Sequence, residues 1–359
     1  PTRQQSRSNR LASAPEMFGD FLFASEAVLV DVGTAQTTGV FPIGGLGMKI
    51  GDNNSPLPRD RVFYRLNYFN NAIRTTQVIN NAATFLNSAS LAQHTVGFEK
   101  TLFDGLASVE LRSAFANRVD IVDSNPFDIS TADLELSAGG EGNLFVVTKF
   151  LLLETDSAAW SAGLGIEAPT GRDAFLATGS ATGPNRLLSV AIQNETVRLH
   201  PYLAKVSAPN RWWFSTIFLE LDLPVSDNTI IFDGVDGTTE AFALQPPTLL
   251  NIDLSAGYWF FKDRRRATLT GLAGIVELHS STTLSDGDTI AEDRDNASDQ
   301  VNFVGSGSFT SDGFGIVNLT VGTHLQLGRQ NHLRIGGVFP ISEDRPFENE
   351  VTVQWNRWF

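Results

Sequence analysis

The chain has 359 residues, and its 40 Asp and Glu against 26 Lys and Arg give a formal net charge of −14 with His neutral. An acidic chain without a basic stripe would be repelled by a phosphate backbone, which argues against nucleic-acid binding. The absence of cysteine excludes disulfides and thiolate metal ligands, and no run approaches the roughly 18 continuous apolar residues that a membrane helix needs.

Residues 1–60 do not share the alternating pattern of the rest of the chain. They open with a basic and polar stretch that carries Arg3, Arg7 and Arg10. The chain starts at Pro1, so we expect a mature form from which an export signal has been removed. Three roles are open for this segment: a plug inside the fold that follows, a periplasmic arm that docks on a partner, or a lead-in that pairs with the rim of that fold.

From residue 61 onward the sequence divides into twelve segments of alternating polarity, bounded by Gly, Asp, Asn and Pro. These predicted strands are 61–70, 93–102, 106–115, 143–154, 158–168, 197–206, 211–223, 249–261, 265–279, 314–327, 331–340 and 348–359. Most have about ten residues or more, which is the length that a tilted strand needs to cross a bilayer. Strands of soluble proteins are nearer five or six residues.

Short and long connections alternate between these segments. The short connections are 103–105, 155–157, 207–210, 262–264 and 328–330, and the long ones are 71–92, 116–142, 169–196, 224–248 and 280–313, with a shorter one at 341–347. Tight turns on the periplasmic side and long outer loops are typical of outer-membrane barrels. A soluble sandwich would not be expected to sort its connections in this way.

The alternation within each segment separates an apolar face from a polar face. In 249–261, for example, Leu250, Ile252 and Leu254 alternate with Asn251 and Asp253. A soluble barrel of twelve strands would have to fill a wide lumen with apolar side chains, whereas a membrane barrel turns its apolar face to lipid. We therefore predict an all-β fold: a transmembrane antiparallel β-barrel of about twelve strands over residues 61–359, in the bacterial outer membrane, with residues 1–60 as an N-terminal extension or plug.

The same parity predicts which charged side chains line the lumen. They are Arg65, Glu99, Glu110, Arg112, Lys149, Glu167, Arg198, Glu220, Asp222, Asp253, Arg334 and Glu350. Charges inside a barrel are costly unless they are paired or hydrated. They predict either a hydrated path with walls of mixed sign or a closed barrel whose charges pair internally, and we favour the hydrated path.

The last predicted strand ends in aromatic residues. Trp355 and Phe359 resemble the C-terminal signal that the bacterial barrel assembly machinery recognises, so we predict an assembly role for both. Aromatic residues near strand ends are expected to form an interfacial girdle. The candidates are Trp160, Trp213, Tyr258, Trp259, Trp355 and Trp358.

Two long connections are acidic, namely 227–240 and 281–299. Their carboxylates could bridge divalent ions to lipopolysaccharide, but the spacing fits no EF-hand loop and a solvated run of charge is the favoured interpretation. The five histidines are scattered singly, and no metalloprotease or serine-hydrolase motif is present. We predict no catalytic residue, no metal site and no cofactor.

Three short stretches resemble a known family: Asp60–Asn70, Gly165–Gly171 and Gly336–Pro340. They are similar to the outer-membrane barrels labelled "putative MetA-pathway of phenol degradation", a transporter-like group, and the resemblance covers roughly residues 60–359. It implies an outer-membrane barrel and uptake of small organic compounds. It transfers no catalytic residue, and it does not fix a substrate.

These observations lead to a first functional hypothesis, a channel or porin-like protein for passive passage of small solutes. Its expected partners are the lipid bilayer, lipopolysaccharide, the barrel assembly machinery and small solutes. The alternative is a structural or docking barrel that anchors an assembly of the cell envelope. A third and weaker hypothesis, an outer-membrane lipid hydrolase, would require a Ser and a His near one rim on the outer wall.

Overall fold

A computed structural model of the chain describes residues 11–20, 25–32, 35–42, 47–79, 83–123, 134–179, 186–234, 239–263, 265–266, 268–285, 288, 290–293, 299–304, 315–343 and 345–359. This part of the chain is almost entirely β-strand, with two 3-10 helices, η1 (Leu11–Ser13) and η2 (Phe103–Gly105). No helix among the described residues is long and apolar enough to cross a membrane.

Twelve long antiparallel strands form a closed barrel. In order around the ring they are β3 (Arg61–Ile79), β4 (Ala83–Leu102), β5 (Ala107–Asp123), β6 (Leu134–Glu154), β7 (Ala158–Ala168), β10 (Arg198–Ser207), β11 (Trp213–Pro224), β14 (Leu249–Lys262), β15 (Leu269–Thr283), β18 (Gly315–Leu327), β19 (Asn331–Pro340) and β20 (Asn349–Trp358). The ring closes because β20 pairs with β3, with Gln354 opposite Arg65. The predicted all-β barrel of about twelve strands is confirmed.

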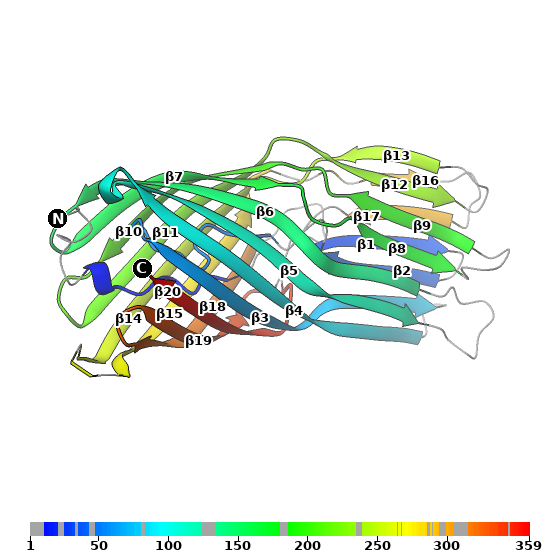
Figure 1. Cartoon of the computed structure of the whole chain (residues 1–359). Coiled ribbons are helices and arrows are strands. Elements are labelled where there is room, and N and C mark those ends of the chain that lie inside the picture. Colours follow the sequence, from blue (N-terminus) through cyan, green and yellow to red (C-terminus); the bar gives the residue numbers. More distant parts are fainter. Residues whose placement is uncertain are drawn as a thin grey trace.

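The short connections between barrel strands lie at one end of the molecule, which we call the turn end (Figure 1). Two of them, 155–157 and 328–330, fall where the sequence predicts them, and a third, predicted at 103–105, extends by one residue to 106. The other two are displaced: β10 ends at Ser207 and β11 begins at Trp213, while β14 continues to Lys262 and β15 begins only at Leu269. The C-terminal strand β20 also ends at the turn end (Figure 1).

At the opposite end, the extension end, further strands continue beyond the barrel (Figure 1), and the described residues form eight of them. They are β1 (Ser25–Val32), β2 (Ala35–Pro42), β8 (Ala174–Gly179), β9 (Arg186–Gln193), β12 (Asn228–Gly234), β13 (Thr239–Leu244), β16 (Ile290–Asp293) and β17 (Asp299–Val304). They pair with one another and with residues 74–79 of β3 and 134–137 of β6, through the pairings β2–β3 and β6–β8. The connections expected to be long polar loops therefore contain strands.

The extension arises because some barrel strands are longer than a bilayer crossing requires. Strands β3, β4 and β6 have 19, 20 and 21 residues. At roughly 3.3 Å per residue they span on the order of 65 Å, about twice the thickness of a hydrocarbon core. About half of each strand is therefore available to continue the sheet beyond a membrane.

The two faces of the barrel wall differ in polarity. In β14, Ile252, Leu254 and Tyr258 are exposed, whereas Asp253 and Ser255 between them are buried. Each of the twelve barrel strands contributes at least one large apolar side chain to the outer surface. Examples in ring order are Tyr68, Val96, Leu111, Phe150, Ile166, Leu203, Ile217, Leu254, Val276, Val321, Ile335 and Val351. The apolar face is thus outside and the polar face inside.

Two stretches of the N-terminal region lie inside the ring (Figure 1), and we call them the inner segments: residues 11–20 and 47–60. All their residues are buried except Ala12, Gly47 and Asp60, which are partly exposed. Between them in the sequence, the β1–β2 hairpin pairs with β3 and β17 at the extension end. The inner segments are largely irregular backbone, so their polar groups need partners from the barrel wall.

Candidate functional site: the barrel interior

Lys49 lies at the centre of a buried group of charges. Its Nζ is 2.6 Å from Asp20 Oδ1 and 2.8 Å from Asp253 Oδ1. His279 Nδ1 is 2.9 Å from the same Asp253 oxygen, and Asn318 donates to Asp20 Oδ2 at 2.8 Å. Burial alone would lower the pKa of Lys49, but the two carboxylates outweigh it and raise the pKa above its usual value. The inner segments are thereby tied to β14, β15 and β18.

Asp20, Asp253 and His279 also have the composition and spacing of a metal-ligand group. The Lys49 ammonium is within hydrogen-bond distance of both carboxylates, so the position that a cation would take between them is filled by a side chain of the chain itself. The arrangement is an internal ion-pair network, in which one ammonium serves two carboxylates.

Glu277 holds the backbone of the first inner segment. Its two oxygens accept hydrogen bonds from the amides of Phe18 and Gly19, at 2.9 and 3.0 Å, and Ser255 adds a third at 2.9 Å. Gly19 has φ of +73°, and a Cβ there would lie 2.3 Å from Asp52 Oδ1. The close approach of the two inner segments therefore requires glycine at this position.

Toward the turn end, Arg59 joins the second inner segment to the first, and Arg61 at the start of β3 pairs with carboxylates of the wall. Arg59 pairs with Glu16 at 2.9 Å, and Arg61 pairs with Glu99 and Glu110 at 2.8 Å each. Burial would raise the pKa of Glu16, but the positive charges of Arg59 and Arg334 outweigh it and hold the pKa well below its usual value. Glu16 is therefore a carboxylate at every pH near neutrality.

Further wall side chains bind the backbone of the second inner segment. Arg112 donates to the carbonyl of Lys49 at 2.9 Å, and Glu220 accepts from the amide of Ile50 at 2.8 Å. Lys149 donates to the side-chain oxygen of Asn54 at 2.9 Å. The irregular backbone inside the ring thus finds its hydrogen-bond partners on β5, β6 and β11.

The predicted lumen-lining residues are placed as follows. Eleven of the twelve are at most 5% exposed, namely Arg65, Glu99, Glu110, Arg112, Lys149, Glu167, Glu220, Asp222, Asp253, Arg334 and Glu350. Arg198, the twelfth, is 13% exposed and pairs with Asp222 at 2.7 Å. A water-filled path would leave such side chains accessible, whereas here they pair with the inner segments and with each other.

Sequence reasoning missed several interior residues. Arg61 and Glu277 are both at most 1% exposed, and His200 and His279 are equally buried. Parity was sufficient to find Glu277, because it shares the face of His279 in the predicted strand 265–279. Arg61 stands at the first position of its strand, where alternation carries little information.

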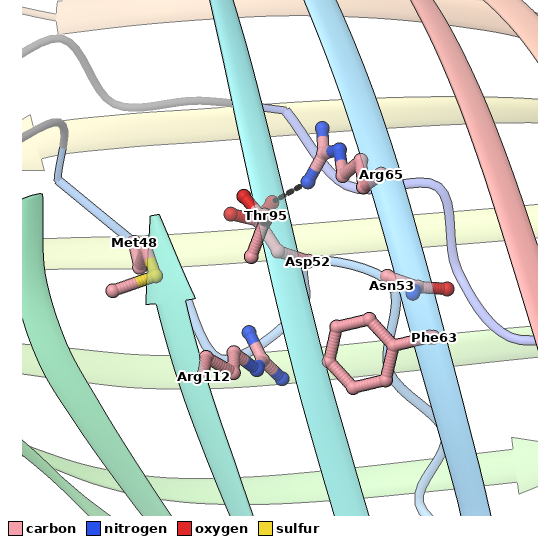
Figure 2. A pocket seen from close by; sticks show the side chains of 7 residues that line it. All are labelled: Met48, Asp52, Asn53, Phe63, Arg65, Thr95 and Arg112. Atoms are coloured by element: carbon pink, nitrogen blue, oxygen red, sulfur yellow. Dashed lines mark ion pairs between the residues drawn. The ribbon is translucent and has the colours of Figure 1, made fainter. Parts of the chain in front are cut away.

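A small cavity remains beside the second inner segment (Figure 2). Arg65 from β3, Thr95 from β4 and Arg112 from β5 surround it together with Asp52 and Asn53. About 10 Å³ is open to the centre of a water molecule, which is room for roughly one water. Burial raises the pKa of Asp52 to about 6 despite the Arg65 guanidinium 3.2 Å away.

The predicted aromatic girdle is correct only in part. Trp213, Tyr258 and Trp355 are exposed on the outer surface. Trp259 is 2% exposed and faces inward, because it shares the parity of Asp253 on β14. Trp358 also turns toward the interior, where its indole N–H donates to Glu16 at 3.1 Å.

Trp160, predicted for the girdle, and Phe359, predicted for the assembly signal, lie at the turn end. Trp160 is partly exposed, with the Lys205 ammonium 4.7 Å from its ring centroid. Phe359 is 56% exposed and stacks on Phe98 with ring centroids 6.3 Å apart. Phe359 and Trp355 are thus both available on the outer surface.

Some sequence predictions fall outside the described residues. They concern Arg3, Arg7 and Arg10 of the N-terminal stretch, and Asp236, Asp286, Arg294 and Asp295 of the acidic connections 227–240 and 281–299. Among the described residues of these connections is Asp288, whose carboxylate accepts a hydrogen bond from the backbone amide of Gln245 at 3.0 Å.

The histidines bear on the hydrolase hypothesis. His200, His279, His324 and His332 are buried inside the barrel. His94 lies on the outward face of β4 and is partly exposed. Its Nδ1 is 2.7 Å from the Tyr64 hydroxyl, so its ring contacts a phenol at this nitrogen rather than a serine.

Comparison with known proteins gives weak similarities. No family model matches the chain, and no curated protein matches it. An outer membrane channel from Pseudomonas putida F1 shares 11% identity, covering 87% of this chain and 100% of that one, with a TM-score of 0.49. The translocator domain of the autotransporter NalP from Neisseria meningitidis shares 8% identity, covering 86% and 90%, with a TM-score of 0.48. The toluene transporter TodX of Pseudomonas putida shares 8%, covering 84% and 90%, with a TM-score of 0.39. At this level of similarity, the function must be inferred from the chain's own residues.

Proposed function

We propose that the chain is an outer-membrane channel for small solutes whose lumen is occupied by its own inner segments. The observation that carries the proposal is the polarity of the wall: every barrel strand has large apolar side chains outside, while the charges lie inside. In water the apolar exterior would be unfavourable, and in lipid it is the required surface. A closed ring also leaves no strand edge exposed to lipid.

The inner segments are suited to move because they are not strands of the ring. They are held to the wall by ion pairs such as Lys49–Asp253 and by hydrogen bonds such as that from Arg112 to the Lys49 carbonyl. The ring itself closes through the pairing of β3 with β20 and does not depend on residues 11–20 or 47–60. Passage of a solute would require part of these segments to leave the lumen while the barrel stays intact.

A cysteine pair tests this mechanism. A Cβ at Gly51 would lie 3.3 Å from Asp253 Cγ, which is close to where a cysteine sulfur would stand. In a disulfide, each Cβ is about 3 Å from the partner sulfur. The chain has no cysteine of its own. Gly51→Cys with Asp253→Cys would therefore form a single defined disulfide between the second inner segment and β14.

The readout is conductance in planar bilayers. We expect low conductance for the oxidised double variant and a rise on reduction, because reduction frees the inner segment from β14. The single variants Gly51→Cys and Asp253→Cys are the controls for the loss of glycine and of the carboxylate, and neither should respond to reductant. A double variant that conducts equally when oxidised and reduced would contradict gating by the inner segments.

The second candidate function is a structural or docking barrel. The near-complete burial of the interior charges favours it, since a barrel that never opens would look the same. Conductance separates the two candidates: a wild-type protein that stays silent across voltages and added solutes, and in which release of the segment changes nothing, would support the docking role.

We further propose the finer assignments made from the sequence. The chain is related to the phenol-degradation transporter family and takes up small organic compounds. Lipopolysaccharide surrounds the barrel, and the assembly machinery recognises Trp355 and Phe359. The exposure of both aromatic side chains supports the last of these. Phe359→Glu should lower surface levels in cells while the purified chain still folds in detergent. Normal surface levels would remove this assignment.

A further inference from the structure

We propose that one side of the rim at the turn end binds the phosphate headgroups of anionic phospholipids. The side chains concerned belong to β10, β20 and the β10–β11, β14–β15 and β18–β19 connections. We call them the basic arc: Lys205, Arg211, Arg265, Arg266, Arg329 and Arg357. All the arginines of the arc are exposed, and the lysine is partly exposed. Binding of this kind requires that the barrel span a membrane, and it does not require conduction.

The members of the basic arc follow one another around the turn end (Figure 1). Strand β10 pairs with β11, and β11 pairs with β14. The amide of Gly328 donates to the carbonyl of Thr268 at 2.7 Å, which joins the β18–β19 connection to the β14–β15 connection. Arg357 on β20 stands opposite Asn331 at the start of β19. The arc is therefore a continuous stretch of the rim from β10 to β20.

Charge is distributed unevenly around this rim. Among the described side chains of the arc and its connections, Asp263 is the acidic one, and it lies 3.8 Å from Arg266. On the remaining part of the rim, Lys100 pairs with Asp60 at 3.2 Å. The end of β6 and the β4–β5 and β6–β7 connections carry carboxylates, namely Asp104, Glu154 and Asp156. The whole chain has a formal net charge of −14, so a basic arc runs against the overall composition and indicates an anionic partner on that side.

The basic arc lies at the edge of the apolar outer surface. Four of its members are two positions closer to the turn end than an exposed large apolar side chain. The pairs are Lys205 with Leu203, Arg211 with Trp213, Arg329 with Leu327, and Arg357 with Trp355. Long cationic side chains at such an edge cover apolar surface with their stems and keep the charged group in the polar layer. The arc therefore follows the boundary at which hydrocarbon gives way to headgroups.

Three members of the basic arc also lie over aromatic rings. The distances from the cationic group to the ring centroid are 4.7 Å for Lys205 and Trp160, 4.4 Å for Arg211 and Trp212, and 5.2 Å for Arg266 and Phe261. Tryptophan rings settle at the level of the headgroups. A guanidinium held there presents a planar set of N–H donors that matches the oxygens of a phosphate.

The position of the arc favours a lipid over a soluble acidic protein. A soluble partner would need a surface that stands clear of the bilayer, whereas four of the six side chains stand two positions from residues of the apolar outer surface. The short turns of outer-membrane barrels face the periplasm. The arc would then meet the inner, phospholipid leaflet of the outer membrane, where each Lys or Arg near an anionic surface strengthens association roughly fivefold.

The tryptophans of the chain provide a local probe of this rim. All six lie within three residues of the turn-end limit of a barrel strand: Trp160, Trp212, Trp213, Trp259, Trp355 and Trp358. Lipids with brominated acyl chains quench tryptophan fluorescence on contact. Quenching therefore reports which lipid gathers at the turn end.

The test uses the full-length protein in vesicles of equal parts phosphatidylglycerol and phosphatidylcholine. In one preparation the phosphatidylglycerol is brominated, and in the matched preparation the phosphatidylcholine is brominated. We expect the anionic lipid to associate with this end about fivefold more strongly than the zwitterionic lipid at low salt. The preference should fall toward one at high salt, because salt screens exposed charges.

Substitutions within the basic arc test the assignment. Combining Arg211→Gln, Arg329→Gln and Arg357→Gln should bring the preference close to one, whereas Lys at the same three positions should retain most of it. Arg345→Gln, which removes an exposed guanidinium in the β19–β20 connection at the other end of the barrel, is the control and should leave the preference unchanged.

A folded-barrel band in unheated gel electrophoresis shows that each variant folds. The pair Arg329→Gln with Arg357→Gln replaces the triple variant if that variant does not fold. Equal quenching by the two brominated lipids in the wild type would overturn the proposal and leave an acidic protein as the partner of the arc. A preference for phosphatidylglycerol that survives the glutamine substitutions would overturn it as well.

Discussion

Lys49 and Asp253 form a buried ion pair of 2.8 Å although 204 positions separate them in the sequence. The pair joins the second inner segment to β14, and Asp20 brings the first inner segment to the same ammonium at 2.6 Å. Three parts of the chain that are remote in sequence therefore depend on one side chain. Its removal would leave two carboxylates buried without their shared cation.

Lys49→Met should consequently destabilise the folded state by about 3–5 kcal/mol, the usual cost of breaking a buried ion pair from one side. Denaturant unfolding of the protein in detergent measures the free energy. Arg172→Gln is the matched control, because the Arg172–Glu141 pair has side chains more than half exposed and should change stability by at most about 1 kcal/mol. Equal effects of the two substitutions would contradict the role given to Lys49.

The raised pKa of Asp52 predicts a pH dependence of stability. Burial raises this pKa from 3.8 to about 6, so in the folded state the carboxyl group holds its proton up to a higher pH than in the unfolded state. Its contribution to stability is full below about pH 4 and is lost as the pH rises through about 6. The difference between these pKa values corresponds to roughly 3 kcal/mol.

Asp52→Asn should therefore be more stable than the wild type at pH 7 and should lose the fall in stability between about pH 4 and pH 6. The amide oxygen can still accept the hydrogen bond from the Lys49 amide that Asp52 accepts at 3.2 Å. Unfolding free energies at several pH values provide the measurement. A variant whose pH profile runs parallel to that of the wild type would show that Asp52 does not titrate in this range.

The outward face of β18 provides a test of the lipid-facing wall. Val321 is 47% exposed on the outer surface, with the polar side chains of Thr320 and Asn318 on the inner face. Val321→Arg should cost roughly 2–4 kcal/mol in a bilayer if the position is near the midplane, because a guanidinium must leave water. Val321→Leu should be nearly neutral. The measurement is the extent of folding into lipid vesicles for both variants. Unchanged folding of the Val321→Arg variant would mean that this face does not contact lipid.

The alternation of Ile252 and Asp253 shows what the sequence reveals: period-2 polarity is local, so strand position and facing direction follow from it. The strands of the extension escaped prediction because segments such as Thr239–Leu244, with six residues, are too short to stand out as bilayer crossings. The pairing of interior charges escaped it for a different reason. Whether Lys49 meets Asp253 or another carboxylate depends on the relative heights of strands around the ring, which no local pattern encodes.

The last prediction concerns conduction by a chain that lacks residues 1–60. Removing the inner segments should raise conductance, because water would replace them in the lumen and hydrate the wall charges that they now neutralise. The ring should survive, since the β3–β20 pairing that closes it involves none of the removed residues. The exposed wall would carry the cations Arg61, Arg65, Arg112, Lys149, Arg198 and Arg334 and the carboxylates of Glu99, Glu110, Glu167, Glu220, Asp222, Asp253, Glu277 and Glu350, six positive against eight negative charges. This excess should favour cations over anions. Conductance and the reversal potential under a salt gradient, measured for both chains, test the two statements separately. Equal conductance of the two chains would place the barrier to passage outside the inner segments. A reversal potential that indicates anion selectivity would show that the wall carboxylates do not govern the open path.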